Sequence, residues 1–239
     1  MKNYLVTGGN SGIGKAVACR LAQNNKVIIL GKNKQRLEEV SSGNENIISL
    51  CCDLVQLENI SNVFSFCKEQ GIKLDGLVHC AGISKNVPVS ANDINDMREV
   101  FTVNCMVFEE LMKYFSKKRY SNDGASVIAM SSMAACTYTK GMSLYAASKG
   151  AVNSMVKVIA KELVRREIRV NAIMPGFVNT KLLTPFRESV ENFDEMIQKE
   201  QPWGLIEPEQ VADLAEFLLS EQSRMITGAL IPITGGKVV

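Results

Sequence analysis

The 239-residue sequence has a single histidine, His79, and its seven cysteines include no Cys-x-x-Cys pair. A single histidine excludes a metal site built from several imidazoles and makes no obvious Ser/His/Asp triad. The odd number of cysteines, several of them within apolar segments, argues against a disulfide framework or a zinc site. We therefore expect reduced thiols, a cytoplasmic location and no metal.

Charge of one sign and long apolar runs are also missing. The chain carries 27 basic and 25 acidic side chains, a formal net charge of +2, which gives no long-range field to attract nucleic acid or anionic lipid. No apolar run approaches the length of a membrane span, and no signal peptide precedes the first expected strand. We expect neither nucleic acid nor a membrane as a partner.

Short apolar, β-branched runs alternate with longer segments of helical period along the whole chain. The expected strands are Tyr4–Val6, Val27–Leu30, Ile47–Leu50, Gly76–Val78, Ser126–Met130, Arg169–Met174 and Ala229–Ile233. The expected helices span about 12–23, 33–41, 56–69, 93–118, 143–165 and 208–220. This alternation predicts an α/β fold, a doubly wound, Rossmann-type parallel sheet of about seven strands with helices on both faces. Without a linker or a repeat, residues 1–239 are expected to form one domain.

The interval 181–204 breaks this rhythm. It follows an expected strand and so falls at the carboxyl edge, where open α/β sheets bind ligands. A lid over the substrate and an ordinary two-helix surface excursion are equally compatible with the sequence.

A glycine-rich segment, Thr7-Gly8-Gly9-Asn10-Ser11-Gly12-Ile13-Gly14, joins the first strand to the first helix. Gly8 and Gly9 allow a tight turn, Gly12 lets backbone amides approach a pyrophosphate, and Gly14 lets the helix pack closely. The helix N-terminus then directs partial positive charge at the phosphates. Because the glycines follow a strand and open a helix, we favour dinucleotide binding over a purely structural turn.

Tyr145 and Lys149 lie four residues apart on an expected helix, so that the ammonium can lie near the phenol. A phenol with a pKa near 10 needs a lowering of about three units, roughly 4 kcal/mol, to act as a base near neutrality. One cation at about 4 Å supplies roughly 1 kcal/mol in water and about 4 kcal/mol at a dielectric constant of 20. The pair would therefore have to be partly desolvated, and in isolation a solvent-facing helix pair is the simpler interpretation.

The spacing T-G-x-x-x-G-x-G, followed by Y-x-x-x-K with a serine thirteen residues before the tyrosine, resembles the short-chain dehydrogenase/reductase family in its compact single-domain branch. The resemblance extends over nearly the whole chain. It implies that Ser132 hydrogen-bonds the substrate oxygen, with Ser131 as the weaker candidate, and that Asn104 holds a water that links the lysine to solvent. The implied catalytic residues are Asn104, Ser132, Tyr145 and Lys149.

The implied reaction is proton-coupled hydride transfer. In the reducing direction Tyr145 donates a proton to the carbonyl oxygen as hydride arrives from the nicotinamide. Lys149 lowers the pKa of the tyrosine and holds the nicotinamide ribose, while Asn104 supports the proton relay.

Further cofactor contacts follow from the same resemblance. Asp53 matches an adenine-contacting aspartate, although it could also be the N-cap of the helix that follows. The segment Pro175–Thr180 matches one that flanks the nicotinamide. The expected cofactor-binding residues are Gly8, Asn10, Ser11, Gly12, Ile13, Gly14, Lys32, Asp53, Leu54, Ala81, Gly82, Tyr145, Lys149, Pro175, Gly176, Val178 and Thr180.

The end of the second strand bears on the choice of cofactor. An NAD site usually places an acid there, but this strand ends Leu30-Gly31-Lys32-Asn33, with no carboxylate before Glu38. Lys32 could meet a 2′-phosphate, although it could also be a solvated lysine. Ser11 stands where some NADP-using relatives carry a second basic residue. We favour NADP over NAD.

Two departures from the family pattern stand out. His79-Cys80 replaces the asparagine pair before Ala81-Gly82, and we interpret His79 as a buried residue with structural hydrogen bonds. Thr234 replaces an aspartate near the C-terminus.

The pattern is most similar to bacterial 3-oxoacyl-thioester reductases and related ketoreductases, which implies an acyl thioester or another small-molecule carbonyl as substrate. Sugar and steroid alcohols remain open. A catalytically silent nucleotide-binding regulatory protein is the alternative from another class, and a nucleotide-sugar epimerase or dehydratase usually carries a larger C-terminal domain. The family also implies a homotetramer or homodimer, formed through the helices at about 93–118 and 143–165.

Overall fold

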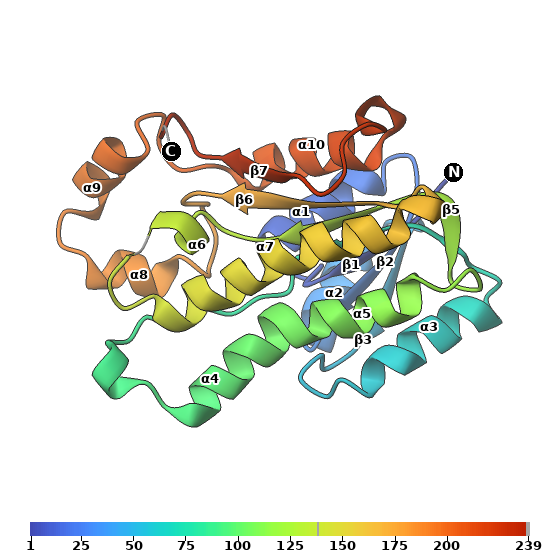
Figure 1. Ribbon diagram of the computed structural model, residues 1–239, viewed down its shortest axis with the longest axis horizontal. Coiled ribbons are helices and arrows are strands. Elements are labelled where there is room, and N and C mark those ends of the chain that lie inside the picture. The colour runs from blue at the N-terminus through green and yellow to red at the C-terminus, as the bar shows by residue number, and fades with distance from the viewer. Residues whose placement is uncertain (138, 238–239) are drawn as a thin grey trace.

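The structure, a computed structural model, describes residues 1–137 and 139–237, and its centre is a seven-stranded sheet in which every pairing is parallel (Figure 1). The strands are β1 (Asn3–Thr7), β2 (Lys26–Gly31), β3 (Ile47–Cys51), β4 (Leu74–His79), β5 (Ser121–Met130), β6 (Arg169–Pro175) and β7 (Leu230–Ile233). Their order in the sheet is β3-β2-β1-β4-β5-β6-β7. From β1 the chain first adds β2 and β3 on one side, and it then returns to add β4 on the other side of β1. A ligand crevice is expected at this switch point between β1 and β4, at the carboxyl ends of the strands.

Helices cover both faces of the sheet, which confirms the predicted doubly wound α/β fold. One face carries α3 (Asn59–Glu69), α4 (Ile94–Phe101), α5 (Val107–Phe115) and α7 (Ser143–Leu163), and the other carries α1 (Gly12–Leu21), α2 (Lys34–Ser41) and α10 (Pro208–Leu219). Three short helices, α6 (Ala134–Thr137), α8 (Thr184–Ser189) and α9 (Phe193–Glu200), gather at the carboxyl edge (Figure 1).

Burial explains why these segments form the sheet. All seven residues of β6 are buried, as are five of the six in β2, and this matches parallel strands that are covered on both faces. At the start of α10, Pro208 occupies the first turn, and the backbone amide of Glu207 donates to Gln210 Oε1 over 2.9 Å. This capping box satisfies amides that the helix itself leaves unpaired.

The predicted helix over 93–118 is one helical segment with an irregular middle. A π-helical turn, Thr102–Met106, joins α4 to α5 and contains Asn104. Turns of this type are rare and occur frequently at functional sites. The interval 181–204 contains α8 and α9, which agrees with two short helices but does not decide between a lid and a surface excursion.

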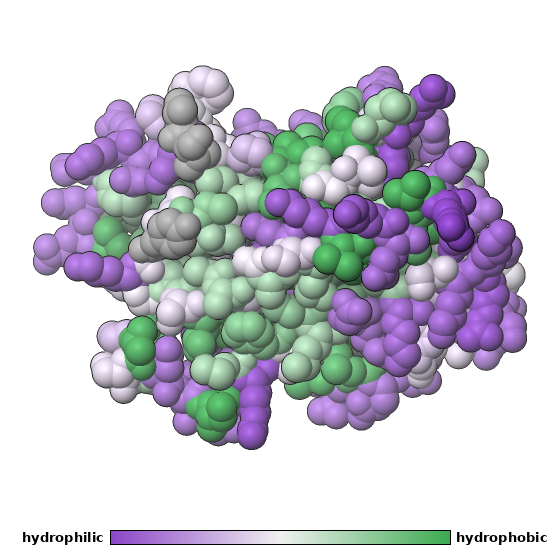
Figure 2. Space-filling view, in the orientation of Figure 1, coloured by the Kyte–Doolittle hydropathy of each residue, from purple (hydrophilic) through white to green (hydrophobic). Residues whose placement is uncertain are grey.

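Figure 2 shows the face of the molecule formed by α4, α5 and α7. Apolar side chains gather over the middle of this face, and hydrophilic ones surround them. Met106 and Val158 contribute to its apolar surface, with 52% and 56% of their areas exposed. Of the helices in the described part of the chain, none combines the length and apolarity that crossing a membrane requires.

Candidate active site

The glycine-rich loop lies between β1 and α1, and its geometry depends on glycine. Gly8 and Gly12 have φ angles of +66° and +49°, a region that side chains disfavour. A Cβ atom on Gly14 would lie 2.3 Å from the carbonyl oxygen of Gly8, so only glycine permits this close packing of the helix. The first turn of α1 contains no acidic residue, and the Ser11 side chain makes no capping hydrogen bond. Such a helix N-terminus fits an anionic pyrophosphate.

The end of β2 lies against this loop. The amide of Gly9 donates to the carbonyl of Leu30 over 3.1 Å, and a Cβ on Gly31 would lie 3.0 Å from the Asn10 side chain. Lys32 follows with an exposed side chain. The structure therefore brings Asn10 and Lys32 to one end of the sheet.

Asp53 follows the neighbouring strand β3. Its Oδ1 atom accepts a hydrogen bond from the amide of Val55 over 3.1 Å, whereas α3 begins at Asn59 and has Glu58 at its N-cap position. The alternative assignment of Asp53 as the N-cap of that helix is therefore wrong, because a turn of several residues separates them. Leu54, beside it, is buried.

Thr7 and His79 join the ends of β1 and β4, where the two residues are paired in register. Thr7 Oγ1 lies 2.9 Å from His79 Nδ1 and accepts a hydrogen bond from the amide of Ala81 over 3.1 Å. Both side chains are fully buried, and the His79 ring stacks on Phe108 with centroids 5.7 Å apart. The predicted structural role of His79 agrees with these contacts.

The environment of His79 keeps its imidazole neutral. Burial lowers its pKa from 6.5 to about 3, and the nearby charge of Lys149 acts in the same direction. The Thr7 hydroxyl, which accepts from Ala81, can either donate to His79 Nδ1 or accept a second bond from it, and the imidazole tautomer sets the direction. Nε2 has no hydrogen-bond partner among the described residues.

Asn104 ties the loop after β4 to α7. Its Nδ2 atom donates to the carbonyl of Ile83 over 3.0 Å and to Ser148 Oγ over 2.9 Å, while its Oδ1 accepts from the Ile83 amide over 2.9 Å. A Cβ on Gly82 would lie 3.3 Å from both Asn104 Oδ1 and Lys149 Nζ. Gly82 therefore lets the chain pass close to two of the predicted catalytic residues.

Tyr145 and Lys149 lie on the first turns of α7, where both are buried. Lys149 Nζ donates to the carbonyl of Met130 over 2.8 Å and lies 5.7 Å from the centre of the Tyr145 ring. Burial lowers the pKa of Lys149 to about 8. The two groups are neighbours and desolvated, as the proposed chemistry requires.

Burial raises the pKa of the Tyr145 phenol above its ordinary value, and the Ser132 hydroxyl opposes this only in part. The sequence predicts the opposite direction, through the charge of Lys149. For the protein without a bound cofactor, the expected lowering of the Tyr145 pKa is wrong. Desolvation of the phenol dominates, and the Lys149 ammonium donates to a backbone carbonyl. The phenol is therefore protonated at neutral pH, which suits a proton donor.

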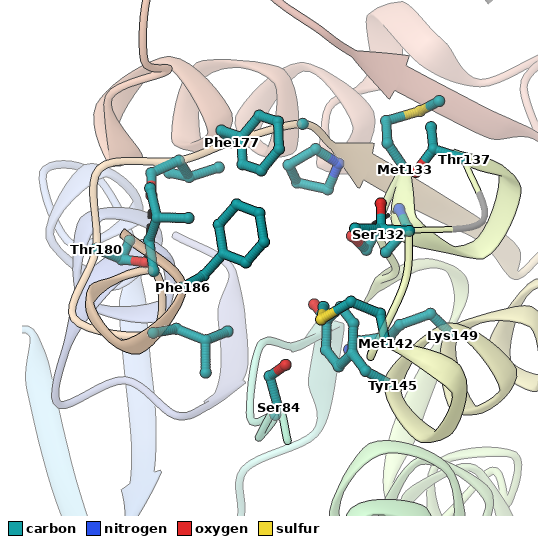
Figure 3. A pocket seen from close by; sticks show the side chains of 18 of the residues that line it. Ser84, Ser132, Met133, Thr137, Met142, Tyr145, Lys149, Phe177, Thr180 and Phe186 are labelled. Atoms are coloured by element: carbon teal, nitrogen blue, oxygen red, sulfur yellow. Dashed lines mark hydrogen bonds between the residues drawn. The ribbon is translucent and has the colours of Figure 1, made fainter. Parts of the chain in front are cut away.

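The two candidate serines differ in their surroundings. Ser131 is buried and its Oγ donates to the carbonyl of Lys149 over 3.3 Å. Ser132 Oγ accepts from the amide of Ala134 over 3.1 Å, which leaves its proton available to another acceptor. Figure 3 shows Ser132 and Tyr145 facing the same pocket, with Lys149 beside the tyrosine. Of the two serines, Ser132 is therefore the one whose hydroxyl proton is not committed to a backbone carbonyl.

This pocket has a volume of about 510 Å³ and opens at the carboxyl edge of the sheet. Its lining joins predicted site residues from distant parts of the chain, namely Ile13, Gly82, Ser132, Tyr145, Lys149, Pro175, Gly176, Val178 and Thr180. Lys32 and Asp53 lie outside it, at the ends of β2 and β3, and Asn104 lies behind it. The described residues include no group of three or more His, Cys, Asp or Glu side chains that could hold a metal ion.

The interval 181–204 contributes much of the opposite wall. Its lining residues are Leu182, Leu183, Pro185, Phe186, Val190, Met196, Glu200 and Gln201. The sequence offered no motif for any of them, because their place in the pocket depends on how α8 and α9 fold back over the carboxyl edge.

Gln201 is a positioning residue that the sequence did not indicate. Its Oε1 accepts from the amide of Phe177 over 2.9 Å, and its Nε2 donates to the carbonyl of Phe177 over 3.0 Å. A Cβ on Gly176 would lie 2.3 Å from the same Oε1. Gln201 thus holds the loop after β6 against the end of α9, with only 1% of its surface exposed.

Comparisons with known proteins agree with this arrangement. The family model described as enoyl-(acyl carrier protein) reductase matches residues 8–237. Carbonyl reductase family member 4 of Xenopus laevis is 32% identical over 97% of this chain and 95% of its own length. The 3-oxoacyl-[acyl-carrier-protein] reductase of Thermotoga maritima is 32% identical over 100% of this chain and 98% of its own.

Solved structures show the same fold. A short-chain dehydrogenase family protein from Francisella tularensis has a TM-score of 0.88 at 33% identity and covers 99% of this chain and 98% of its own. A 4-hydroxyisoleucine dehydrogenase mutant complexed with NADH and succinate scores 0.92 at 27% identity, with 99% and 98% covered. A candidate NAD(P)-dependent gluconate 5-dehydrogenase from Beutenbergia cavernae with bound NADP scores 0.90 at 29% identity, with 98% and 96% covered.

The family model spans nearly the whole chain, and relatives above 30% identity align over almost their full lengths. These relatives are reductases, and their common fold is the one described above. The chain belongs to the short-chain dehydrogenase/reductase family and is an oxidoreductase that acts on CH–OH and carbonyl groups.

Proposed function

We propose that this chain is a ketoreductase that uses a nicotinamide cofactor, preferably NADP, to reduce a carbonyl to a secondary alcohol. The observation that carries the proposal is a buried, protonated Tyr145 phenol beside the Ser132 hydroxyl, in a pocket that begins at the glycine-rich loop. Acyl thioesters are the leading substrates, because relatives named 3-oxoacyl-[acyl-carrier-protein] reductase align over the whole chain. Sugar and steroid alcohols are the alternatives.

The residues present fit a dinucleotide. The loop from Gly8 to Gly14 requires glycine for its own packing, since a Cβ on Gly14 would lie 2.3 Å from the carbonyl oxygen of Gly8, and it leads into a helix N-terminus without acidic residues that suits a pyrophosphate. Neighbours crystallised with NADH and with NADP support a nicotinamide cofactor. The exposed Lys32, followed by a first turn of α2 without acidic residues, supports a 2′-phosphate and hence NADP. Asp53 and Leu54 would lie at the adenine.

A bound reduced nicotinamide supplies the hydride. Ser132 Oγ donates a hydrogen bond to the substrate oxygen and fixes its position. Tyr145 gives its phenolic proton to that oxygen as negative charge develops there. The Lys149 ammonium, 5.7 Å from the ring, stabilises the phenolate that forms. Asn104 donates to Ser148 Oγ, which in turn donates to the Tyr145 carbonyl over 2.7 Å. We assign Asn104 a place in the relay that returns a proton to the Tyr145 phenol.

Replacement of the tyrosine tests this assignment. We expect Tyr145→Phe to lower kcat for carbonyl reduction by about 10²–10⁴-fold, the usual contribution of a positioned proton donor, while the Kd for NADPH changes less than about threefold. Steady-state kinetics and a fluorescence titration of NADPH measure the two effects. The matched control is Tyr114→Phe on α5, away from the pocket.

Wild-type turnover in Tyr145→Phe, with the control also active, would overturn the assignment. A wild-type protein that binds NADPH but reduces no carbonyl compound would instead favour the catalytically silent regulatory protein.

We also infer that the chain forms one domain with residues 181–204 as its substrate lid, because these residues line the wall of the pocket opposite Tyr145. The apolar face over α4, α5 and α7 supports a homodimer or homotetramer. The cytoplasmic location stays a prediction.

A further inference from the structure

We propose that the pocket selects uncharged carbonyl compounds that carry an apolar chain or ring, and that it discriminates against carboxylates and other anions. This inference rests on the proposed function and deepens it, since it names the substrate class of the same site. Three features of the pocket support it: an apolar wall, a group of methionines, and the Glu200–Lys237 ion pair at the rim.

The apolar wall faces the catalytic groups. In Figure 3, Phe177 and Phe186 lie across the pocket from Ser132 and Tyr145. Their rings stack with centroids 5.7 Å apart and planes 16° apart. The aliphatic residues Leu182, Leu183, Pro185 and Val190 extend this wall. A substrate whose carbonyl reaches Tyr145 therefore places its remaining chain against apolar surface, where burial favours alkyl and aromatic groups.

Four methionines line the same pocket, namely Met130, Met133, Met142 and Met196. Methionine is unbranched and polarisable, and it can repack around ligands of different shape. We therefore expect the pocket to accept apolar chains and rings of different shape.

The charged groups among the described lining residues are already engaged. Lys237 Nζ forms an ion pair with Glu200 at the rim and holds the pKa of that carboxyl below its ordinary value. Lys149 is 3% exposed and donates to the Met130 carbonyl. A substrate carboxylate would thus leave water and compete with Glu200 for Lys237, which is costly in a largely apolar pocket.

A series of carbonyl compounds tests the substrate class. With NADPH, we expect kcat/KM to rise about fourfold per methylene from ethyl 3-oxobutanoate through ethyl 3-oxohexanoate to ethyl 3-oxooctanoate, as transfer of alkyl surface predicts. Ethyl 4-oxopentanoate should exceed the 4-oxopentanoate anion by about tenfold or more. A flat chain-length series, or an anion that reacts as well as its ester, overturns the proposal.

Two opposite charge changes separate electrostatics from loosened structure. Glu200→Gln leaves Lys237 cationic, and Lys237→Gln leaves Glu200 anionic, yet both remove the same ion pair. We expect the first variant to raise, and the second to lower, the ratio of kcat/KM for 4-oxopentanoate to that for its ethyl ester, each by about two- to fivefold. A shift of both ratios in the same direction shows that the pair only holds the C-terminal segment, and overturns the argument from charge.

Calorimetry distinguishes failure of this inference from failure of the proposed function. In the presence of NADPH, 2-nonanone should bind measurably and nonanoate at least about tenfold more weakly. Binding of 2-nonanone without reduction of any ketone would overturn the proposed ketoreductase activity, but it would leave the preference of the pocket for uncharged apolar compounds intact. Equal binding of nonanoate overturns the substrate class, whatever the activity.

Discussion

At the scale of single residues, His79 shows how burial turns a titratable side chain into a neutral structural group. Its ring is enclosed by Thr7, Phe108 and the turn that holds Asn104, and its pKa falls from 6.5 to about 3. A group whose folded-state pKa is depressed binds its proton more weakly in the native protein than in the unfolded chain. The contribution of His79 to native stability is therefore fully present above pH 6.5 and is lost as the pH falls from 6.5 toward 3.

Because His79 is the only histidine, its contribution can be measured separately. We expect the free energy of unfolding to fall by about 1 kcal/mol between pH 6.5 and pH 5.5, since a full proton difference corresponds to about 1.4 kcal/mol per pH unit. Urea unfolding at pH 5.5, 6.0, 6.5 and 7.5 measures this slope. His79→Asn should have a much flatter profile over the same range. Equal slopes in both proteins would show that another group titrates.

Lys32 allows a test of cofactor choice at the same scale. We expect Lys32→Asp to lower kcat/KM for NADPH by about tenfold or more and to shift preference toward NADH, because a carboxylate repels a 2′-phosphate and can accept from ribose hydroxyls. Kinetics with both cofactors and one ketone give the ratio. Lys68→Asp, an equal charge change in the last turn of α3, should leave the ratio unaltered. A wild-type preference for NADH would contradict the choice of NADP.

At the scale of elements, the end of α10 depends on a buried arginine from β6. Arg169 Nη1 donates to the carbonyl of Leu218 over 2.7 Å and to Ser223 Oγ over 2.8 Å, and Nη2 donates to the carbonyl of Ser220 over 3.0 Å. These carbonyls are among those that a helix leaves unpaired at its C-terminus. One side chain thus joins the sheet to the helix that packs on α1.

We therefore expect Arg169→Met to reduce the free energy of unfolding by about 2–4 kcal/mol, because the charged donor is lost and the Leu218 and Ser220 carbonyls keep only serine hydroxyls as donors. The control is Arg165→Met, an exposed arginine four residues earlier, which should change stability by less than about 0.5 kcal/mol. Urea denaturation at pH 7.5 compares the two. A loss below 1 kcal/mol in Arg169→Met would mean that water replaces the guanidinium.

At the scale of the whole molecule, the apolar face over α4, α5 and α7 predicts self-association. We expect light scattering after size exclusion to give the mass of a dimer or tetramer, and Val158→Glu to lower that mass, because a buried unpaired carboxylate is costly. Val55→Glu, an apolar-to-acidic change near the start of α3, is the control and should keep the wild-type mass. A monomeric wild-type protein would contradict the prediction.

The sequence alone determined the fold class, because it rests on local periodicity. Alternating strands and helices specify the parallel sheet. The loop from Thr7 to Gly14 could be interpreted as a dinucleotide-binding loop because it lies between a strand and a helix. The four catalytic candidates were likewise available, through the resemblance of their spacing to the family pattern, and the structure brings three of them to the pocket, with Asn104 behind it.

Only the tertiary structure decided what surrounds these residues. The direction of the Tyr145 pKa follows from desolvation by segments far away in sequence, and the clamp made by Gln201 depends on how the end of α9 meets the loop after β6. The apolar wall and the Glu200–Lys237 pair arise in the same way. Local patterns record the period of an element, whereas burial and charge pairing depend on which distant elements meet, and no spacing along the chain specifies that.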